Sequence, residues 1–151
     1  RGTSDAAPMA LGRIECIVAA WDAERLLLER IRREVFVREQ GIPESDEWDD
    51  EDATSVHILA TLNREPVGTG RLNRAGKIGR IAVLPGLRGR GIGSLILGRL
   101  LEEARRLGIR EPCLHAQVQA VPFYERLGFE RKGDVFDEAG IPHVRMSLVL
   151  E

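Results

Sequence analysis

One junction constrains the fold of this chain more than any other feature. Residues 80–101 read RIAVLPGLRGRGIGSLILGRLL, in which an apolar stretch runs into a glycine- and arginine-rich turn. The apolar stretch is typical of a strand, and the apolar positions after the turn recur at helical spacing. A strand joined to a helix by a short turn is a building unit of mixed α/β domains and does not suit an all-helical bundle or an all-β sandwich.

The same junction predicts a binding site for a phosphate. The first turn of a helix leaves backbone N–H groups without partners and carries the positive end of the helix dipole. The three glycines let the backbone approach a bulky anion, and the two arginines add charge-assisted donors. The expected phosphate-binding residues are Arg88, Gly89, Arg90, Gly91, Ile92, Gly93 and Ser94.

Two common phosphate motifs do not fit this junction. The P-loop pattern fails because no Lys-Ser or Lys-Thr pair follows the second glycine. The dinucleotide-binding fingerprint lacks its third glycine, and Glu111 lies before the next strand instead of at its end. A surface loop with two solvated arginines is the remaining alternative to a phosphate site.

The rest of the chain predicts one mixed α/β domain around a single sheet. Alternating or continuous apolar stretches predict strands at 13–19, 54–62, 66–74, 77–84, 112–118, 129–136 and 142–150. Helical spacing predicts helices over 22–40 (with a break near the end of this helix), after the glycine-rich turn, and at 120–127. Short turns between the strands predict a mostly antiparallel sheet. The acidic stretch 44–52 predicts an exposed loop.

Composition excludes several classes of function. With 151 residues the chain fits one domain, expected over 13–151, and residues 1–12 are expected to form a disordered or loosely held tail. The net charge of -2 gives no general attraction to nucleic acid, and no apolar run reaches the ~20 residues that span a membrane. Cys16 and Cys113 are expected as buried, reduced thiols of a cytoplasmic protein, and no cysteine or histidine spacing indicates a metal site.

Two motifs resemble those of a known family. The pattern Arg-x-x-Gly-x-Gly at 88–93 resembles the pyrophosphate-binding motif of the GNAT acetyltransferase superfamily. Residues 120–129, AVPFYERLGF, resemble its later helix, with Gln117 where an asparagine is more usual. The segments HAQ at 115–117 and GIPH at 140–143 are similar to those of a small ElaA-type bacterial branch. The resemblance covers about 13–150.

The resemblance implies a binding geometry for acetyl-CoA as co-substrate. The pantetheine arm is expected between the strand that ends at Val83 and the strand near 114–118, paired with backbone groups like an added strand. A backbone N–H near Val83 or Leu84 is expected to stabilise an oxyanion, and the pyrophosphate is expected at 88–94. Beyond that turn, the expected co-substrate contacts are Ile81, Ala82, Val83, Gln117, Phe123 and Tyr124.

The resemblance also implies the reaction, which is transfer of an acetyl group to a primary amine of a small molecule or peptide within a ternary complex. Tyr124 is the expected general acid, because a phenol (pKa ~10) is protonated when a thiolate (pKa of the thiol ~8.5) leaves. The alternative is that Tyr124 is a structural core residue whose hydroxyl only forms a hydrogen bond within the protein.

The base is harder to assign. Many GNAT enzymes carry a glutamate on the strand that corresponds to 78–83, and this chain has none there. His115 is a possible base acting through water, or else an ordinary strand histidine. His57 and His143 are expected to be structural. The acidic segment 46–52 either orders over the acceptor site and attracts a cationic amine or is a solvated loop.

Two other functions remain open. One is a regulatory module that binds acetyl-CoA without turnover, which the missing strand glutamate favours. The other is an acyltransferase like the acyl-homoserine-lactone synthases, which share the fold, use acyl carrier protein and generally lack the Arg-x-x-Gly-x-Gly turn. The protein is expected as a monomer or homodimer. The residues that resemble the lactone synthases are Val35, Phe36, Trp48, Asp49, Asp52, Arg71 and Leu72.

Overall fold

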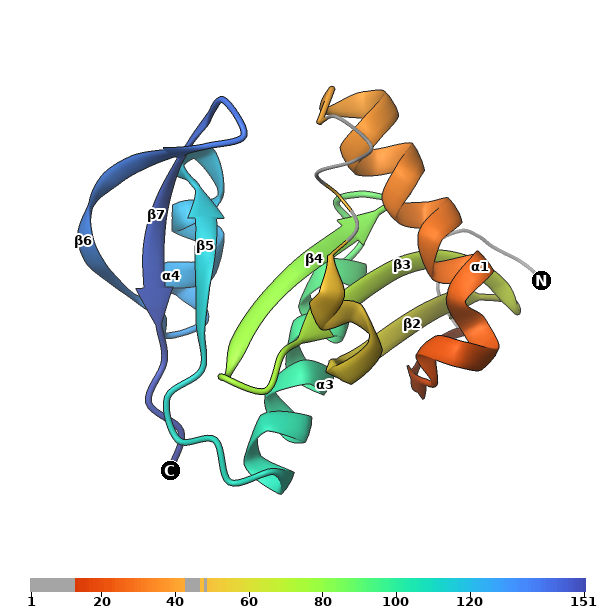
Figure 1. The fold of residues 1–151 in the computed structure, drawn as a ribbon, viewed down its shortest axis with the longest axis horizontal. Helices are drawn as coiled ribbons and strands as arrows, with labels where there is room; N and C mark the ends of the chain where they lie inside the picture. Colours follow the sequence, from red (N-terminus) through yellow and green to blue (C-terminus); the bar gives the residue numbers. More distant parts are fainter. Residues whose placement is uncertain (1–12, 43–46, 48) are drawn as a thin grey trace.

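The structure is a computed structural model that describes residues 13–42, 47 and 49–151 (Figure 1). The tail predicted over 1–12 and part of the acidic stretch, at 43–46 and 48, lie outside the described residues. No helix in the described part of the chain has the length and apolar character needed to cross a membrane.

A single seven-stranded sheet forms the centre of the fold. Its strands are β1 (Ile14–Ala19), β2 (Val56–Leu62), β3 (Glu65–Leu72), β4 (Lys77–Val83), β5 (Cys113–Gln117), β6 (Glu130–Glu138) and β7 (Ile141–Ser147). They lie in the order β1-β2-β3-β4-β5-β7-β6. Every neighbouring pair is antiparallel except β4 and β5, which run parallel. The predicted mixed α/β fold with a mostly antiparallel sheet is confirmed.

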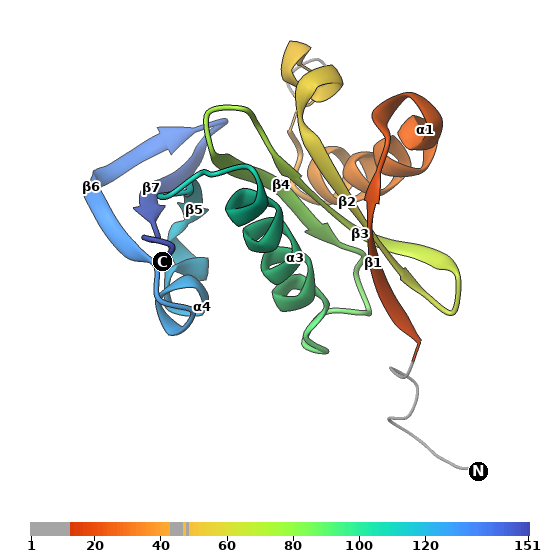
Figure 2. The same cartoon turned by 90° about the horizontal axis from the view of Figure 1, so that it is seen from below.

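Helices cover both faces of the sheet (Figure 2). They are α1 (Trp21–Arg32), α3 (Ile92–Arg106) and α4 (Val121–Arg126), with shorter segments η3 (Arg33–Glu39), η4 (Asp50–Thr54) and η5 (Val118–Ala120). Buried residues of α1 and η3 pack on one face, against Leu59 and Ala82. Buried residues of α3 pack on the other face with Ile58, Leu72 and Met146. The sheet therefore separates two apolar layers, as the periodicities predict.

The first helical region has the predicted extent and is interrupted, as expected, in its later part. The α-helical geometry ends at Arg32, and the chain continues as the π-helical segment η3. Its wider turns appear in the hydrogen bonds from the amides of Gln40 and Ile42 to the carbonyls of Val35 and Phe36. The widening keeps Val35 buried against the sheet while Phe36 also lines a cavity. π-Helical turns often occur at functional sites.

Two glycines of β3 set the distance between the sheet and α3. A Cβ atom on Gly68 would lie 2.8 Å from Ile96, and one on Gly70 would lie 2.6 Å from the same side chain. Real Cβ atoms do not approach other atoms so closely, so only glycine at both positions allows α3 to pack at this depth. This packing fixes where the start of α3 lies relative to β4.

β4 contains an irregularity that opens the sheet. Thr69 pairs with Ala82 and Arg71 with Gly79, so β4 has one more residue than β3 between these pairs. Arg80 lies in this bulge with φ of 52°, and its carbonyl accepts a hydrogen bond from the Thr69 hydroxyl. On its other edge, β4 pairs with β5 only through Lys77 with Cys113 and Ile78 with Leu114. The predicted separation of the two strands beyond this point is confirmed.

Candidate active site

Two cavities lie along β4. The first, which we call the strand cavity, has a volume of ≈ 290 Å³ and occupies the separation between β4 and β5. Residues of both strands line it, together with Gln40, Tyr124 and Glu138. The second, the glycine-loop cavity, has a volume of ≈ 460 Å³ and is lined by the turn before α3, by Val83 and by α4.

The two cavities adjoin along the same elements. On β4, Ile81 lines the strand cavity and Val83 lines the glycine-loop cavity. On α4, Tyr124 lines the strand cavity and its neighbour Phe123 lines the glycine-loop cavity. Val83 and Phe123 therefore lie on the side of the glycine-loop cavity that is nearest in sequence to the lining of the strand cavity.

The glycine-loop cavity has the backbone geometry of an anion site. Gly91 is the N-cap of α3 with φ of 84°, and Gly89 has φ of 80°, a region that favours glycine. No side chain of the described residues caps the helix, so the N–H groups of its first turn are left for a ligand. A Cβ at Gly93 would have Val83 at 4.0 Å as its nearest contact, which leaves open space at the helix start.

The other predicted residues of this turn lie in different environments. Ser94 is exposed and lines the glycine-loop cavity. Ile92 also lines it, but its side chain is 1% exposed and belongs to the core, so only its backbone is free to meet an anion. Arg90 is exposed and is not among the described residues that line either cavity.

Arg88 is already engaged by an acidic residue that the sequence analysis missed. Its guanidinium forms a bidentate ion pair with Glu39 at the end of η3, and its Nε donates to the Val83 carbonyl at 3.0 Å. The hydrogen bond to Arg88 holds the pKa of the Glu39 carboxyl below its usual value. Glu39 and Arg88 are 49 residues apart, so no local pattern connects them.

The backbone of β4 supports only part of the prediction that an amide near Val83 or Leu84 stabilises an oxyanion. The Leu84 amide donates to the Val67 carbonyl at 3.0 Å, so it is not free to stabilise an oxyanion. Because amides alternate between the two edges of a strand, the Val83 amide faces the open edge. The Ala82 side chain is 2% exposed and packs against the α1 layer, so its predicted contact is limited to backbone atoms.

Tyr124 lies between aromatic neighbours and the strand cavity. Its ring contacts Phe123 and Phe129 edge-on, with centroids 5.1 and 5.8 Å away. Burial raises the pKa of its phenol, which keeps the hydroxyl protonated over a wider pH range. The hydroxyl has no hydrogen bond to any described residue, and its oxygen is not fully buried. It is therefore available to a ligand.

His115 lies across the strand cavity and is paired with a second carboxylate that the sequence analysis missed. Its Nδ1 is 2.8 Å from Oε1 of Glu138, at the end of β6. Burial alone would raise the pKa of the Glu138 carboxyl, but the hydrogen bond to His115 and the nearby positive charges outweigh burial and lower it. The pair spans 23 residues, and it forms only because β7 lies between β5 and β6.

The other predicted polar residues take defined places. Gln117 lines the strand cavity and donates to Gln40 of the first helical region at 3.1 Å. His57 is 2% exposed, lies 2.7 Å from the Asp52 carbonyl and stacks on Trp21, as expected of a structural histidine. His143 is also buried, but it lines the strand cavity, so it belongs to the site.

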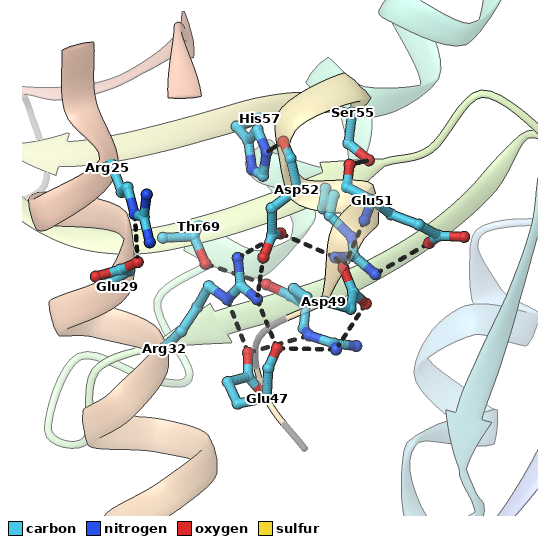
Figure 3. A network of polar contacts seen from close by, with 12 residues as sticks. Arg25, Glu29, Arg32, Glu47, Asp49, Glu51, Asp52, Ser55, His57 and Thr69 are labelled. Carbon is cyan, nitrogen blue, oxygen red and sulfur yellow. Dashed lines mark hydrogen bonds and ion pairs between the residues drawn. The ribbon is translucent and has the colours of Figure 1, made fainter. Parts of the chain in front are cut away.

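In its described residues, the acidic segment before β2 is only partly the exposed loop that its composition predicts, because Asp49, Asp50 and Glu51 are exposed but two other carboxylates are buried. Among its described residues, Glu47 and Asp52 are 2% and 3% exposed. Figure 3 shows both side chains directed toward Arg32 of α1, with Asp49 close by. Three buried or partly buried arginines neutralise these carboxylates, and they are Arg32, Arg71 and Arg80.

The distances in this network indicate a structural role. Arg32 donates to Glu47 at 2.7 Å and to Asp52 at 2.9 Å, and Arg71 donates to Asp52 at 2.9 Å. Burial opposes the ionisation of Asp52, but the hydrogen bonds from these arginines lower its pKa. Nε of Arg80 lies 3.0 Å from Glu47 without the alignment of a hydrogen bond.

This network bears on two of the sequence-based expectations. The carboxylates of Glu47, Asp49 and Asp52 are paired with arginine, which favours a structural role for them over attraction of a cationic amine. Of the residues that resemble those of lactone synthases, Arg71 donates hydrogen bonds to both Asp49 and Asp52, and Trp48 lies outside the described residues.

Comparisons with known proteins agree with this fold. A sequence profile of the acetyltransferase (GNAT) domain matches residues 29–150. The uncharacterized N-acetyltransferase YjcF of Bacillus subtilis is 40% identical over 120 residues, which cover 77% of this chain and 86% of that protein. Protein ElaA of Escherichia coli is 34% identical over 128 residues, covering 80% of this chain and 84% of ElaA.

Solved structures give the same result. The crystal structure of Escherichia coli ElaA superposes with a TM-score of 0.81 at 30% identity, covering 90% of this chain and 99% of that chain. An acyl-CoA N-acyltransferase from Pseudomonas aeruginosa superposes with a TM-score of 0.75 at 29% identity, covering 91% and 99%. The chain therefore belongs to the GNAT acetyltransferase family, in its ElaA-like branch.

Proposed function

We propose that this protein transfers the acetyl group of acetyl-CoA to a primary amine of a small molecule or peptide, by direct attack within a ternary complex. The observation that carries the proposal is the pair of adjoining cavities along β4, one beside an anion-binding helix start and one lined by ionisable side chains. This arrangement gives a phosphate-bearing donor and an amine acceptor separate approaches to one point, near Tyr124.

The residues at the glycine-loop cavity fit coenzyme A. The first-turn amides of α3 and the glycines at 89, 91 and 93 suit the pyrophosphate. The open edge of β4 at Val83 suits an extended arm that hydrogen-bonds like an added strand. Arg88 would leave Glu39 to bind a phosphate oxygen, because both anions compete for one guanidinium.

Acetyl-CoA supplies a thioester whose carbonyl carbon accepts the amine and whose sulfur leaves as a thiolate. The protein must therefore hold one proton for the sulfur and remove one from the amine. Tyr124 is the proposed proton donor, because its hydroxyl has no partner among the residues that the structure describes and its burial keeps it protonated. His115 is the proposed acceptor of the amine proton, directly or through water.

A thiol-release assay tests this function. The protein would be incubated with acetyl-CoA and a panel of primary amines that includes free amino acids, polyamines and peptides with a free N-terminus. Amine-dependent release of coenzyme A thiol, with the acetylated amine identified by mass spectrometry, is the expected result. Release that no amine accelerates would contradict the proposal.

The two alternatives predict different outcomes of the same experiments. A regulatory module binds acetyl-CoA but acetylates nothing, and the absence of an acidic residue from β4 is the feature that favours it. An enzyme like the lactone synthases would accept acylated carrier protein and would not bind coenzyme A.

We place the protein in the cytoplasm because Cys16 and Cys113 are free thiols. Both side chains are half-buried, whereas the sequence led us to expect fully buried thiols.

A further inference from the structure

The strand cavity contains a histidine and a carboxylate arranged as a pair. His115 is on β5, Glu138 ends β6, and β7 pairs with both strands and brings them together. Nδ1 of His115 lies 2.8 Å from Oε1 of Glu138. The Phe136 ring lies edge-on to the imidazole at 4.9 Å, which limits its rotation.

The other nitrogen of His115 is open. Nε2 has no hydrogen bond to any described residue. It is also not fully buried, because Arg80 Nε is the only side-chain polar atom of the described residues that is both fully buried and without a hydrogen bond. A carboxylate bound to Nδ1 requires that nitrogen to carry the proton, since an ionised carboxylate only accepts. The lone pair of a neutral His115 is then on Nε2.

We propose that Glu138 is a positioning residue that holds His115 in the Nδ1–H tautomer and stabilises the imidazolium formed when Nε2 takes a proton from the acceptor amine. This rests on the proposed acetyltransferase function. The amine nitrogen forms its bond to the acetyl carbon, the carbon–sulfur bond breaks, and the electron pair of the broken N–H bond stays on nitrogen. A carboxylate behind the imidazole replaces the strand glutamate that this chain lacks.

Other titratable side chains lie near the His115–Glu138 pair, but none of the described residues replaces His115 as the hydrogen-bond partner of Glu138. Nε2 of His143 lies 3.9 Å from the other oxygen of Glu138, while Nδ1 of His143 lies 2.7 Å from the Ile141 carbonyl. Lys77 exerts a favourable charge on Glu138. The titratable or charged residues that face the strand cavity from its several elements are Glu47, Lys77, Arg80, His115, Tyr124, Glu138 and His143.

Steady-state kinetics with acetyl-CoA and the fastest amine of the panel test the role of Glu138. We expect Glu138→Gln to lower kcat about tenfold or more, with acetyl-CoA affinity unchanged within about twofold. Asp137→Asn makes the same charge change at the exposed neighbouring residue and should leave both quantities unchanged.

A double-mutant cycle separates positioning from a general structural effect. In a His115→Ala background, Glu138→Gln should change kcat by less than about twofold, because the two residues act as one unit. An equal fractional loss in both backgrounds would overturn the proposal, as would wild-type activity of Glu138→Gln. Either result would leave the acetyltransferase function itself intact.

Nitrogen NMR of the histidine side chains provides a readout that needs no turnover. In the complete protein, neutral His115 should carry its proton on Nδ1, and Glu138→Gln should give a mixture of tautomers. A wild-type His115 with its proton on Nε2 would refute the positioning role even if no amine were acetylated. Failure of the proposed function would appear separately, as absent thiol release.

Discussion

Tyr124 shows how burial and an open hydroxyl combine at the residue scale. Aromatic neighbours surround its ring, and burial raises the pKa of the phenol. The hydroxyl nevertheless has no partner among the described residues. A core tyrosine usually satisfies its hydroxyl, so this arrangement favours the proton-donor role over the alternative left open by the sequence.

Removing that hydroxyl gives the first prediction. Tyr124→Phe should lower kcat by roughly 100-fold, the low end of general-acid contributions, because no proton reaches the leaving sulfur. Acetyl-CoA affinity should be unchanged, since the ring and its contacts remain. Steady-state kinetics measure kcat, and calorimetric titration of the same preparation measures the acetyl-CoA affinity. An unchanged kcat would remove Tyr124 from the mechanism.

Gly93 allows a test of the anion site without backbone strain. Unlike Gly91, it does not have positive φ, and a Cβ there meets only Val83 at 4.0 Å. Gly93→Glu should weaken acetyl-CoA binding on the order of 100-fold, because a like charge beside the pyrophosphate costs several kcal/mol.

The matched control is Gly98→Glu, on an exposed part of the same helix where a Cβ meets nothing. This variant should bind acetyl-CoA like the wild type, since the added charge lies away from the turn. If both variants bound equally well, the glycine-loop cavity would not be the pyrophosphate site.

At the scale of elements, η3 and β4 are the two irregular pieces, and both border the site. Apolar spacing predicted the helix of 22–40 but not its π-helical end, because the spacing of Val35 and Phe36 suits either geometry. The bulge at Arg80 was equally invisible, since positive φ at an arginine depends on the Thr69 hydrogen bond and on the ion pairs of its side chain. The local sequence pattern therefore predicts where helices and strands lie, whereas the π-helical segment and the bulge depend on tertiary contacts.

The pair between η3 and the glycine-rich turn gives an element-scale prediction. Glu39→Gln should tighten acetyl-CoA binding by up to about fivefold, because Arg88 no longer has to leave an ion pair of about 0–1 kcal/mol. Glu34→Gln is the control, since Glu34 pairs with Arg38 and not with Arg88. Weaker binding by Glu39→Gln in calorimetry would mean that Glu39 instead holds Arg88 in its binding position.

The buried ionic network joins η4 to α1 and β3, and its disruption should be costly. Asp52→Asn should lower the free energy of unfolding by about 3 kcal/mol, because Arg32 and Arg71 would keep uncompensated buried charge. Urea denaturation measures this change. Asp50→Asn, at an exposed position of the same turn, should change it by less than about 0.5 kcal/mol. Similar losses from both would contradict the network.

The pH dependence of this contribution has a definite sign. The folded-state pKa of Asp52 is lowered, so its contribution is present above the ordinary carboxyl value of ~3.9 and is lost as pH falls through the lowered value. Glu47 has a raised pKa because of its burial, which acts in the opposite direction. The comparison of Asp52→Asn with wild type isolates the first effect, and wild type should lose more stability on acidification.

For the whole molecule, the site lies at the seam between two parts of one sheet. β1 to β4 carry α1 and α3, while β5, β7 and β6 carry α4, and only two residue pairs join β4 to β5. Element order, fold and the glycine-rich turn were predictable because each follows from periodicity or a local motif. Glu39, Glu138 and the buried carboxylates were not, because their partners lie 15 to 49 residues away.

The most direct test of the account is a calorimetric titration of the wild-type protein with acetyl-CoA, with NADH as a control that also carries a pyrophosphate. We predict saturable acetyl-CoA binding with a Kd on the order of micromolar and no measurable NADH binding, because the proposed mode of binding requires a pantetheine arm along β4 and NADH has none. Absence of acetyl-CoA binding, or equal binding of NADH, would contradict the assignment of the two cavities.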